Sequence, residues 1–175
     1  MPYLIANFAL FQASWVALVA GAANGLLIPG VLLTALFLGW ELRRSENPGG
    51  LALLVALAVF GGIIVDGGYA LSGVVDYQLP AGPLAPWWIL GLWVVFSLTL
   101  TESMGWMRDR RLIGSLMAGV SAPLSYYAGY KLGAVEFPRG LWFAMGVAAI
   151  TWMPAIFALV TLSNRLLPKK TAAPA

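Results

Sequence analysis

Two acidic residues lie inside long apolar segments, where an ionisable group is rare. Asp66 falls within the apolar stretch 51–72 and Glu102 within the stretch 86–106. Burying an acid in a membrane costs free energy, so such a residue is a functional hypothesis by default. The chemistry open to it is holding a proton, binding a ligand, or acting as a general acid or base.

The chain contains neither histidine nor cysteine. This excludes a Ser-His-Asp triad, a cysteine nucleophile, a disulfide framework, His-ligated haem and the usual zinc sites. Two isolated acids at different depths also make a poor site for a hard metal ion. The sequence therefore predicts no catalytic residues, no metal and no cofactor, and it favours a protein that is not an enzyme.

The composition indicates a membrane protein. Of 175 residues, 61% are hydrophobic and 10% are charged, whereas soluble domains carry about 25% charged residues. The mean hydropathy is +0.85. A chain this apolar with long uncharged runs is typical of a protein that lies in a lipid bilayer.

Six segments are long and apolar enough to be transmembrane helices of about 20 residues. They are Tyr3–Ala22, Leu26–Leu42, Leu51–Ser72, Pro86–Trp106, Leu112–Lys131 and Leu141–Asn164. We therefore predict an all-α fold, a bundle of six transmembrane helices forming a single domain over residues 1–166. Residues 167–175 are predicted to form a flexible cytoplasmic tail.

The basic residues predict the orientation of the bundle. Most of them follow the second, fourth and sixth segments: Arg43, Arg44, Arg108, Arg110, Arg111, Arg165, Lys169 and Lys170. With six spans these positions share one side, which the positive-inside rule assigns to the cytoplasm together with both termini. Because the basic residues are split among short membrane-flanking segments, nucleic acid is a poor candidate partner.

Helical rise predicts which polar groups share a depth with each acid. Asp66 falls in the outer half of the membrane, where an outer group is predicted: Asp66, Tyr69, Trp93, Tyr126 and Lys131. Lys131 is the proposed counter-ion. This group is either a ligand or proton site, or a protonated acid whose hydrogen bonds tie helices together.

A second, inner polar group is predicted near the cytoplasmic end. It comprises Asn7, Gln12, Glu41, Glu102 and Ser103, with Asn164 close by. Glu41 precedes Arg44 by three residues, which predicts a pair on one helix face. Glu102 is expected to reach the interface or to pair with an arginine of the segment 108–111. The interface is near, so a purely structural role is favoured here.

Four runs together resemble a known family over most of the chain. They are Asn7–Trp15, Gly61–Asp66, Pro86–Trp93 and Ala122–Gly129. In order and spacing they resemble the small bacterial inner-membrane family filed as domain of unknown function 2878. The chain departs from that pattern where members often carry histidine near the ends of spans two and four, because Glu41 and Glu102 stand there.

The resemblance implies a multi-pass protein of the bacterial inner membrane with six spans and no assigned activity. Genes of the family often lie beside genes for fatty-acid-modifying enzymes, which implies a role in envelope lipid metabolism. A mechanism that needs histidine is in doubt for this chain, but another titratable group can still handle protons.

Three functions remain open at this point. The first is binding or moving a lipid or small hydrophobic molecule, with proton coupling through Asp66 as one form. The second is a structural or assembly partner of another membrane protein in an envelope-lipid complex. The third is a membrane-embedded lipid-modifying enzyme that uses Asp66 and Tyr126 as acid and base.

Overall fold

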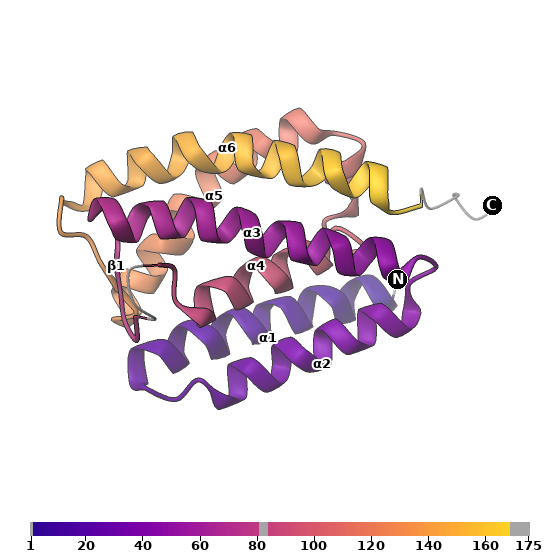
Figure 1. Cartoon of the computed structure of the whole chain (residues 1–175), viewed down its shortest axis with the longest axis horizontal. Coiled ribbons are helices and arrows are strands. Elements are labelled where there is room, and N and C mark those ends of the chain that lie inside the picture. Colours follow the sequence, from indigo (N-terminus) through magenta and orange to yellow (C-terminus); the bar gives the residue numbers. More distant parts are fainter. Residues whose placement is uncertain (1, 81–83, 169–175) are drawn as a thin grey trace.

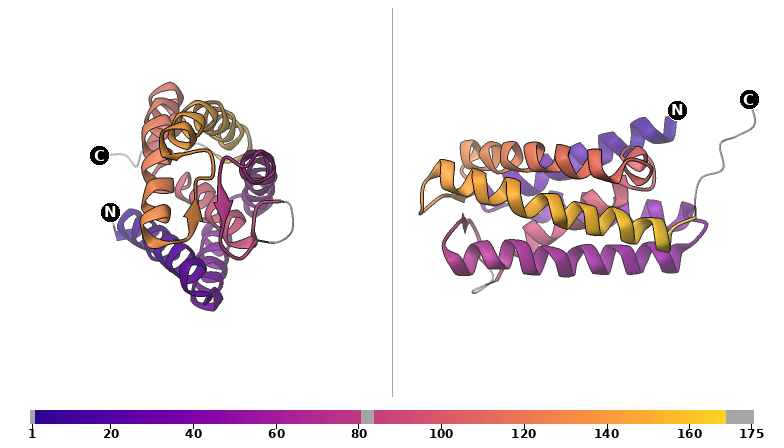
Figure 2. Two further views of the ribbon diagram at one scale, coloured as in Figure 1. Left: turned by 90° about the vertical axis from the view of Figure 1, so that its left-hand side faces the viewer. Right: turned by 90° about the horizontal axis from the view of Figure 1, so that it is seen from above.

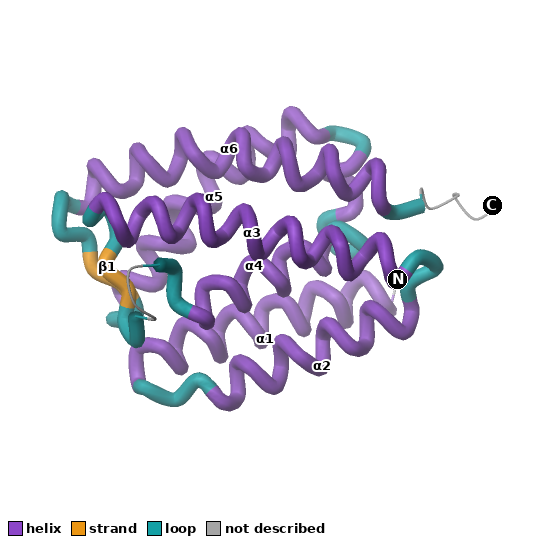
Figure 3. The backbone as a smooth tube through the Cα atoms, in the orientation of Figure 1, coloured by secondary structure: helices purple, strands orange, loops and turns teal. Residues whose placement is uncertain are grey.

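The computed structural model describes residues 2–80 and 84–168, and most of them are helical. Six α-helices lie side by side along the long axis of the molecule (Figures 1 and 3). They are α1 (Pro2–Asn24), α2 (Ile28–Arg44), α3 (Pro48–Ser72), α4 (Trp87–Thr99), α5 (Arg111–Leu132) and α6 (Leu141–Leu166). The predicted all-α class is confirmed.

Consecutive helices run in opposite directions, so their connections alternate between two ends of the bundle (Figure 1). Segments 25–27, 73–80, 84–86 and 133–140 meet at one end, which we call the strand end. Segments 45–47 and 100–110 meet at the other, together with the start of α1 and the end of α6. We call this the basic end, because Arg44, Arg108 and Arg165 lie there.

Three of the described helices, α1, α3 and α6, are long and apolar enough to cross a membrane. Their outward faces expose large apolar side chains such as Ile5, Phe60 and Ile150. Exposed apolar surface on this scale is costly in water and favourable against lipid chains. The structure therefore has the surface of a membrane protein.

Helix α4 lies near the middle of the bundle (Figure 2). Trp87 is its one exposed residue. The predicted extent of this segment to residue 106 was wrong, because α4 ends at Thr99 and the chain continues through turns into a 3-10 helix, η1 (Gly105–Arg108).

The early end of α4 has a local cause. The hydroxyls of Ser97 and Thr99 each donate to the backbone carbonyl three residues earlier, at 2.7 Å and 2.6 Å. Such bonds compete with the hydrogen-bond ladder of an α-helix. As a result Glu102 and Ser103 lie in a turn at the basic end rather than on a helix face.

Two glycine-capped loops meet at the strand end. Helices α3 and α5 stop at Gly73 and Gly133, whose φ angles of +66° and +82° favour glycine. The loops that follow pair as two short antiparallel strands, β1 (Asp76–Tyr77) and β2 (Val135–Glu136). The sequence did not predict this pair, which turns Tyr77 back into the bundle.

Helices α3 and α4 pack closely at a glycine. Gly62 faces the indole ring of Trp93, and a Cβ atom added to Gly62 would overlap Cδ1 and Nε1 of that ring. Only a residue without a side chain lets the two helices approach this closely. Gly62 thereby fixes the position of Trp93, a residue that also contacts Asp66.

Replacing Gly62 with alanine tests this contact. Gly62→Ala is expected to lower the free energy of unfolding by about 1–3 kcal/mol, because the new methyl group displaces a buried indole. The matched control is Gly68→Ala on the same helix, where a Cβ meets nothing within 4 Å. Thermal unfolding in detergent measures both, and equal melting temperatures for the two variants would contradict the contact.

Candidate functional site

Asp66 is the most enclosed acid of the bundle, with 1% of its surface exposed. Its carboxyl oxygen Oδ1 accepts hydrogen bonds from the hydroxyls of Tyr77, at 2.8 Å, and Tyr126. Its other oxygen, Oδ2, accepts from the indole Nε1 of Trp93 at 2.7 Å. We call these four residues the Asp66 site.

Each partner of Asp66 comes from a different element. Tyr77 lies on β1, Trp93 on α4 and Tyr126 on α5, while Asp66 itself lies on α3. Burial, and then the nearby charge of Asp66, raise the pKa of the Tyr77 hydroxyl well above its usual value. Tyr77 therefore remains a hydrogen-bond donor. The Asp66 carboxyl group joins its own helix α3 to β1, α4 and α5.

A cavity of about 450 Å³ opens beside this carboxyl group. Its walls come from α1, α4, α5 and α6, and Asp66 of α3 completes them. The lining is mostly apolar and includes seven aromatic side chains: Phe11, Trp15, Trp88, Trp93, Phe96, Tyr126 and Trp152. A pocket of roughly 300–1,000 Å³ with mostly apolar walls and few polar groups is typical of small-molecule sites.

One polar atom of the cavity wall lacks a hydrogen-bond acceptor. Among the described residues, Nε1 of Trp152 is buried without one. The Trp152 ring stacks on Trp93 with centroids 4.7 Å apart, so this donor lies close to the Asp66 site.

The structure brings only part of the predicted outer group to Asp66. Trp93 and Tyr126 bind its carboxyl group directly. Tyr69 is buried one ring away, packed edge-on against Tyr126 with centroids 5.8 Å apart, and its hydroxyl pairs with Thr151. Lys131 is exposed, and its ammonium group lies over the ring of Tyr127 at 5.4 Å.

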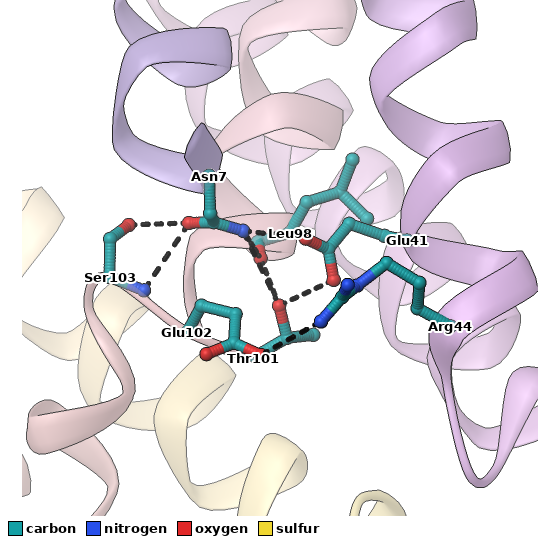
Figure 4. Close-up of polar contacts among 7 residues, drawn as sticks. All are labelled: Asn7, Glu41, Arg44, Leu98, Thr101, Glu102 and Ser103. Carbon is teal, nitrogen blue, oxygen red and sulfur yellow. Dashed lines mark hydrogen bonds and ion pairs between the residues drawn. The ribbon is translucent and has the colours of Figure 1, made fainter. Parts of the chain in front are cut away.

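A second polar cluster lies at the basic end, between α1, α2 and the end of α4 (Figure 4). The amide of Asn7 donates to Glu41 Oε1 at 2.8 Å and to the Leu98 carbonyl at 3.1 Å. Thr101 donates to Glu41 Oε2 at 2.8 Å, and Ser103 donates to Asn7 Oδ1 at 2.5 Å. We call these five residues the Asn7 cluster.

The charged residues beside this cluster pair differently from the sequence prediction. Glu41 is buried and accepts from neutral donors instead of facing Arg44. Arg44 instead lies 3.8 Å from Glu102 (Figure 4), and its guanidinium stacks over Tyr3. The Glu41 carboxyl points into the bundle, whereas Arg44 remains partly exposed, as a cation requires.

Two other residues of the predicted inner group lie elsewhere. Gln12 lines the cavity of the Asp66 site and is exposed. Asn164 exchanges hydrogen bonds with Arg108, whose guanidinium also donates to the carbonyl of Leu167 at 2.8 Å. Burial lowers the pKa of Arg108 from its usual value. Lys169, Lys170 and most of the predicted tail lie outside the described residues.

Sequence reasoning missed Tyr77 and Thr101. Tyr77 follows Asp66 by eleven residues across a glycine turn, and no periodicity indicates that a loop folds back. Thr101 lies in the turn just after α4, and the serine and threonine hydroxyls at the end of this helix are the available signal that it stops there.

The Asp66 site can bind a ligand or exchange a proton, because an acid and a tyrosine hydroxyl touch in a cavity wall. In the described part of the chain no three acids gather in a way that would hold a metal ion. The fold and the site together define an all-helical protein with membrane-compatible helices and a buried acid beside an aromatic cavity.

The chain belongs to a family described as "Protein of unknown function (DUF2878)", whose model matches residues 4–158. This confirms the family expected from the sequence. No curated protein and no solved structure matches the chain.

The Asn7 cluster makes a testable contribution to stability. Asn7→Ala removes a donor to Glu41 and leaves a buried carboxyl group with fewer partners, so we expect a loss of about 2–3 kcal/mol in the free energy of unfolding. Asn24→Ala, at the exposed end of the same helix, removes one bond to its own helix and should cost under about 0.5 kcal/mol. Chemical denaturation in mixed micelles measures the free energy of unfolding of both variants. Equal losses in Asn7→Ala and Asn24→Ala would contradict this prediction.

Proposed function

We propose that this chain is an integral protein of the bacterial inner membrane that binds or moves a lipid or small hydrophobic molecule in the cavity beside Asp66. The observation that carries the proposal is the cavity itself, about 450 Å³ with mostly apolar walls that include seven aromatic side chains. Its single acid is buried and held by three hydrogen bonds. A space of this size, with one charged group and apolar walls, matches the general form of a ligand site.

The route into the cavity supports a ligand that comes from the lipid phase. Its α5 wall includes Leu124 and Ser121, which are exposed on the side of the bundle. Across the cavity Trp15 of α1 donates to Ser125 of α5 at 3.1 Å, the hydrogen bond that links these two walls. A hydrophobic molecule dissolved in the bilayer would reach the cavity at this exposed part of α5 without crossing water.

Proton coupling through Asp66 is part of the proposal. Its carboxyl group lies in the cavity wall, so it can take up a proton from outside the site, or release one, without rearranging the helices. Gain or loss of that proton would change the charge of the cavity wall and therefore its affinity for a polar ligand. This gives Asp66 a role in ligand movement as well as in holding helices.

The proposed membrane placement has six spans with both termini in the cytoplasm. The basic residues at one end of the bundle support it, because they favour the cytoplasmic side. We expect alkaline phosphatase fused after Lys170 to be inactive, and the same enzyme inserted after Pro138, at the strand end, to be active. An active fusion after Lys170 would contradict the orientation.

A membrane enzyme that modifies lipids is the second candidate. The contact between Asp66 and Tyr126 favours it, since an acid and a phenol in one cavity wall can act as acid and base. Incubation of the purified protein with total lipid extract, followed by mass spectrometry, distinguishes the candidates. A new product that disappears in Asp66→Ala would favour the enzyme over the binding protein.

Filling the cavity tests the proposed function directly. Ala122 lies in the cavity wall, so Ala122→Phe should remove most of the lipid or small molecule that co-purifies with the wild type. Ala158→Phe, on the outward face of α6, adds the same volume to a lipid-facing position and should leave co-purification unchanged. Mass spectrometry of gently purified protein measures both, and equal retention by the two variants would refute the proposal.

A further inference from the structure

The charge balance of the cavity identifies the class of molecule that fits it. Asp66 accepts three hydrogen bonds, and all three donors are neutral: two tyrosine hydroxyls and one indole. An ionised carboxylate in this place thus has hydrogen-bond partners but no positive charge to balance it. The basic residues nearest the strand end, Lys131 and Arg139, are exposed and stack on aromatic rings instead.

The carboxyl group also keeps one open acceptor position. A carboxylate offers about four lone-pair positions, two on each oxygen. Oδ1 receives both tyrosine hydroxyls, whereas Oδ2 receives the Trp93 indole alone. One position on Oδ2 remains for a donor, and Asp66 contributes to the cavity lining.

The walls near this acid are suited to a cation. The stacked rings of Trp93 and Trp152 and the ring of Tyr126, which meets Trp152 edge-on with centroids 6.3 Å apart, lie beside the carboxyl group. Tryptophan and tyrosine faces attract ammonium groups, most strongly where water is excluded. An anionic molecule such as a fatty-acid carboxylate would instead be repelled by Asp66.

We propose that the cavity binds a hydrophobic amine in its protonated form, with the ammonium group donating to Asp66 Oδ2 among the indole rings. The apolar part of the molecule occupies the remaining cavity toward Phe11 and Phe96 on α1 and α4. This inference rests on the proposed function, because it names the class of ligand for the same cavity. It predicts that a positive charge, and not hydrophobicity alone, determines affinity.

A matched pair of probes tests this inference. The probes are 4-bromobenzylamine and 4-bromobenzyl alcohol, which share shape and differ in charge, and bromine quenches tryptophan fluorescence. They are titrated into the wild type in nanodiscs of zwitterionic phosphatidylcholine. We expect the amine to quench with an affinity on the order of tenfold higher than the alcohol. An alcohol that binds as tightly as the amine would overturn the inference.

Two variants make the test specific. Asp66→Asn should abolish the preference for the amine while the alcohol still binds, and binding of the alcohol reports that the cavity is folded. Lys131→Gln, which removes a positive charge remote from the carboxyl group, should leave the preference unchanged. Persistence of the preference in Asp66→Asn would also overturn the inference.

The two proposals fail in distinguishable ways. If neither probe binds but lipid or small molecule still co-purifies and is lost in Ala122→Phe, the amine inference fails and the proposed function stands. If neither probe binds and Ala122→Phe retains as much co-purifying lipid or small molecule as the wild type, both the amine inference and the proposed function fail.

Discussion

One buried carboxyl group connects four elements of the bundle. Asp66 accepts hydrogen bonds from Tyr77, Trp93 and Tyr126, which belong to a loop strand and two other helices. In a membrane interior such bonds have no water to compete with them, so an acid can hold several segments together. The same carboxyl group contributes to the wall of the cavity. Asp66 therefore contributes both to the packing of the bundle and to the proposed ligand site.

Helix α4 shows why the bundle needs polar contacts at both ends. It has 13 residues, or about 20 Å at the usual helical rise, which is less than a membrane span. Toward the strand end Trp93 attaches it to Asp66, and at the basic end its last carbonyls and the following turn attach to Asn7 and Glu41. A short central helix held at both ends leaves space beside it, and the cavity occupies that space.

Much of this arrangement can be predicted from the sequence. The features that could not be predicted were missed for identifiable physical reasons. Apolar length and the positions of charges predict six helices and their approximate limits. Helical rise gives depth, which is why Asp66, Trp93 and Tyr126 could be grouped. Depth says nothing about which way a side chain faces around its helix, so Lys131 was included although it stacks on Tyr127. Tyr77 could not be found, because its position depends on strand pairing between two loops.

The location of a bound amine tests the central claim most directly. Crystals of the wild-type protein soaked with 4-bromobenzylamine would give an anomalous bromine signal that marks where the molecule lies. We expect a peak inside the cavity beside Trp152, with the amine nitrogen at hydrogen-bonding distance from Asp66 Oδ2. A bromine peak confined to the lipid-facing surface, with an empty cavity, would contradict it.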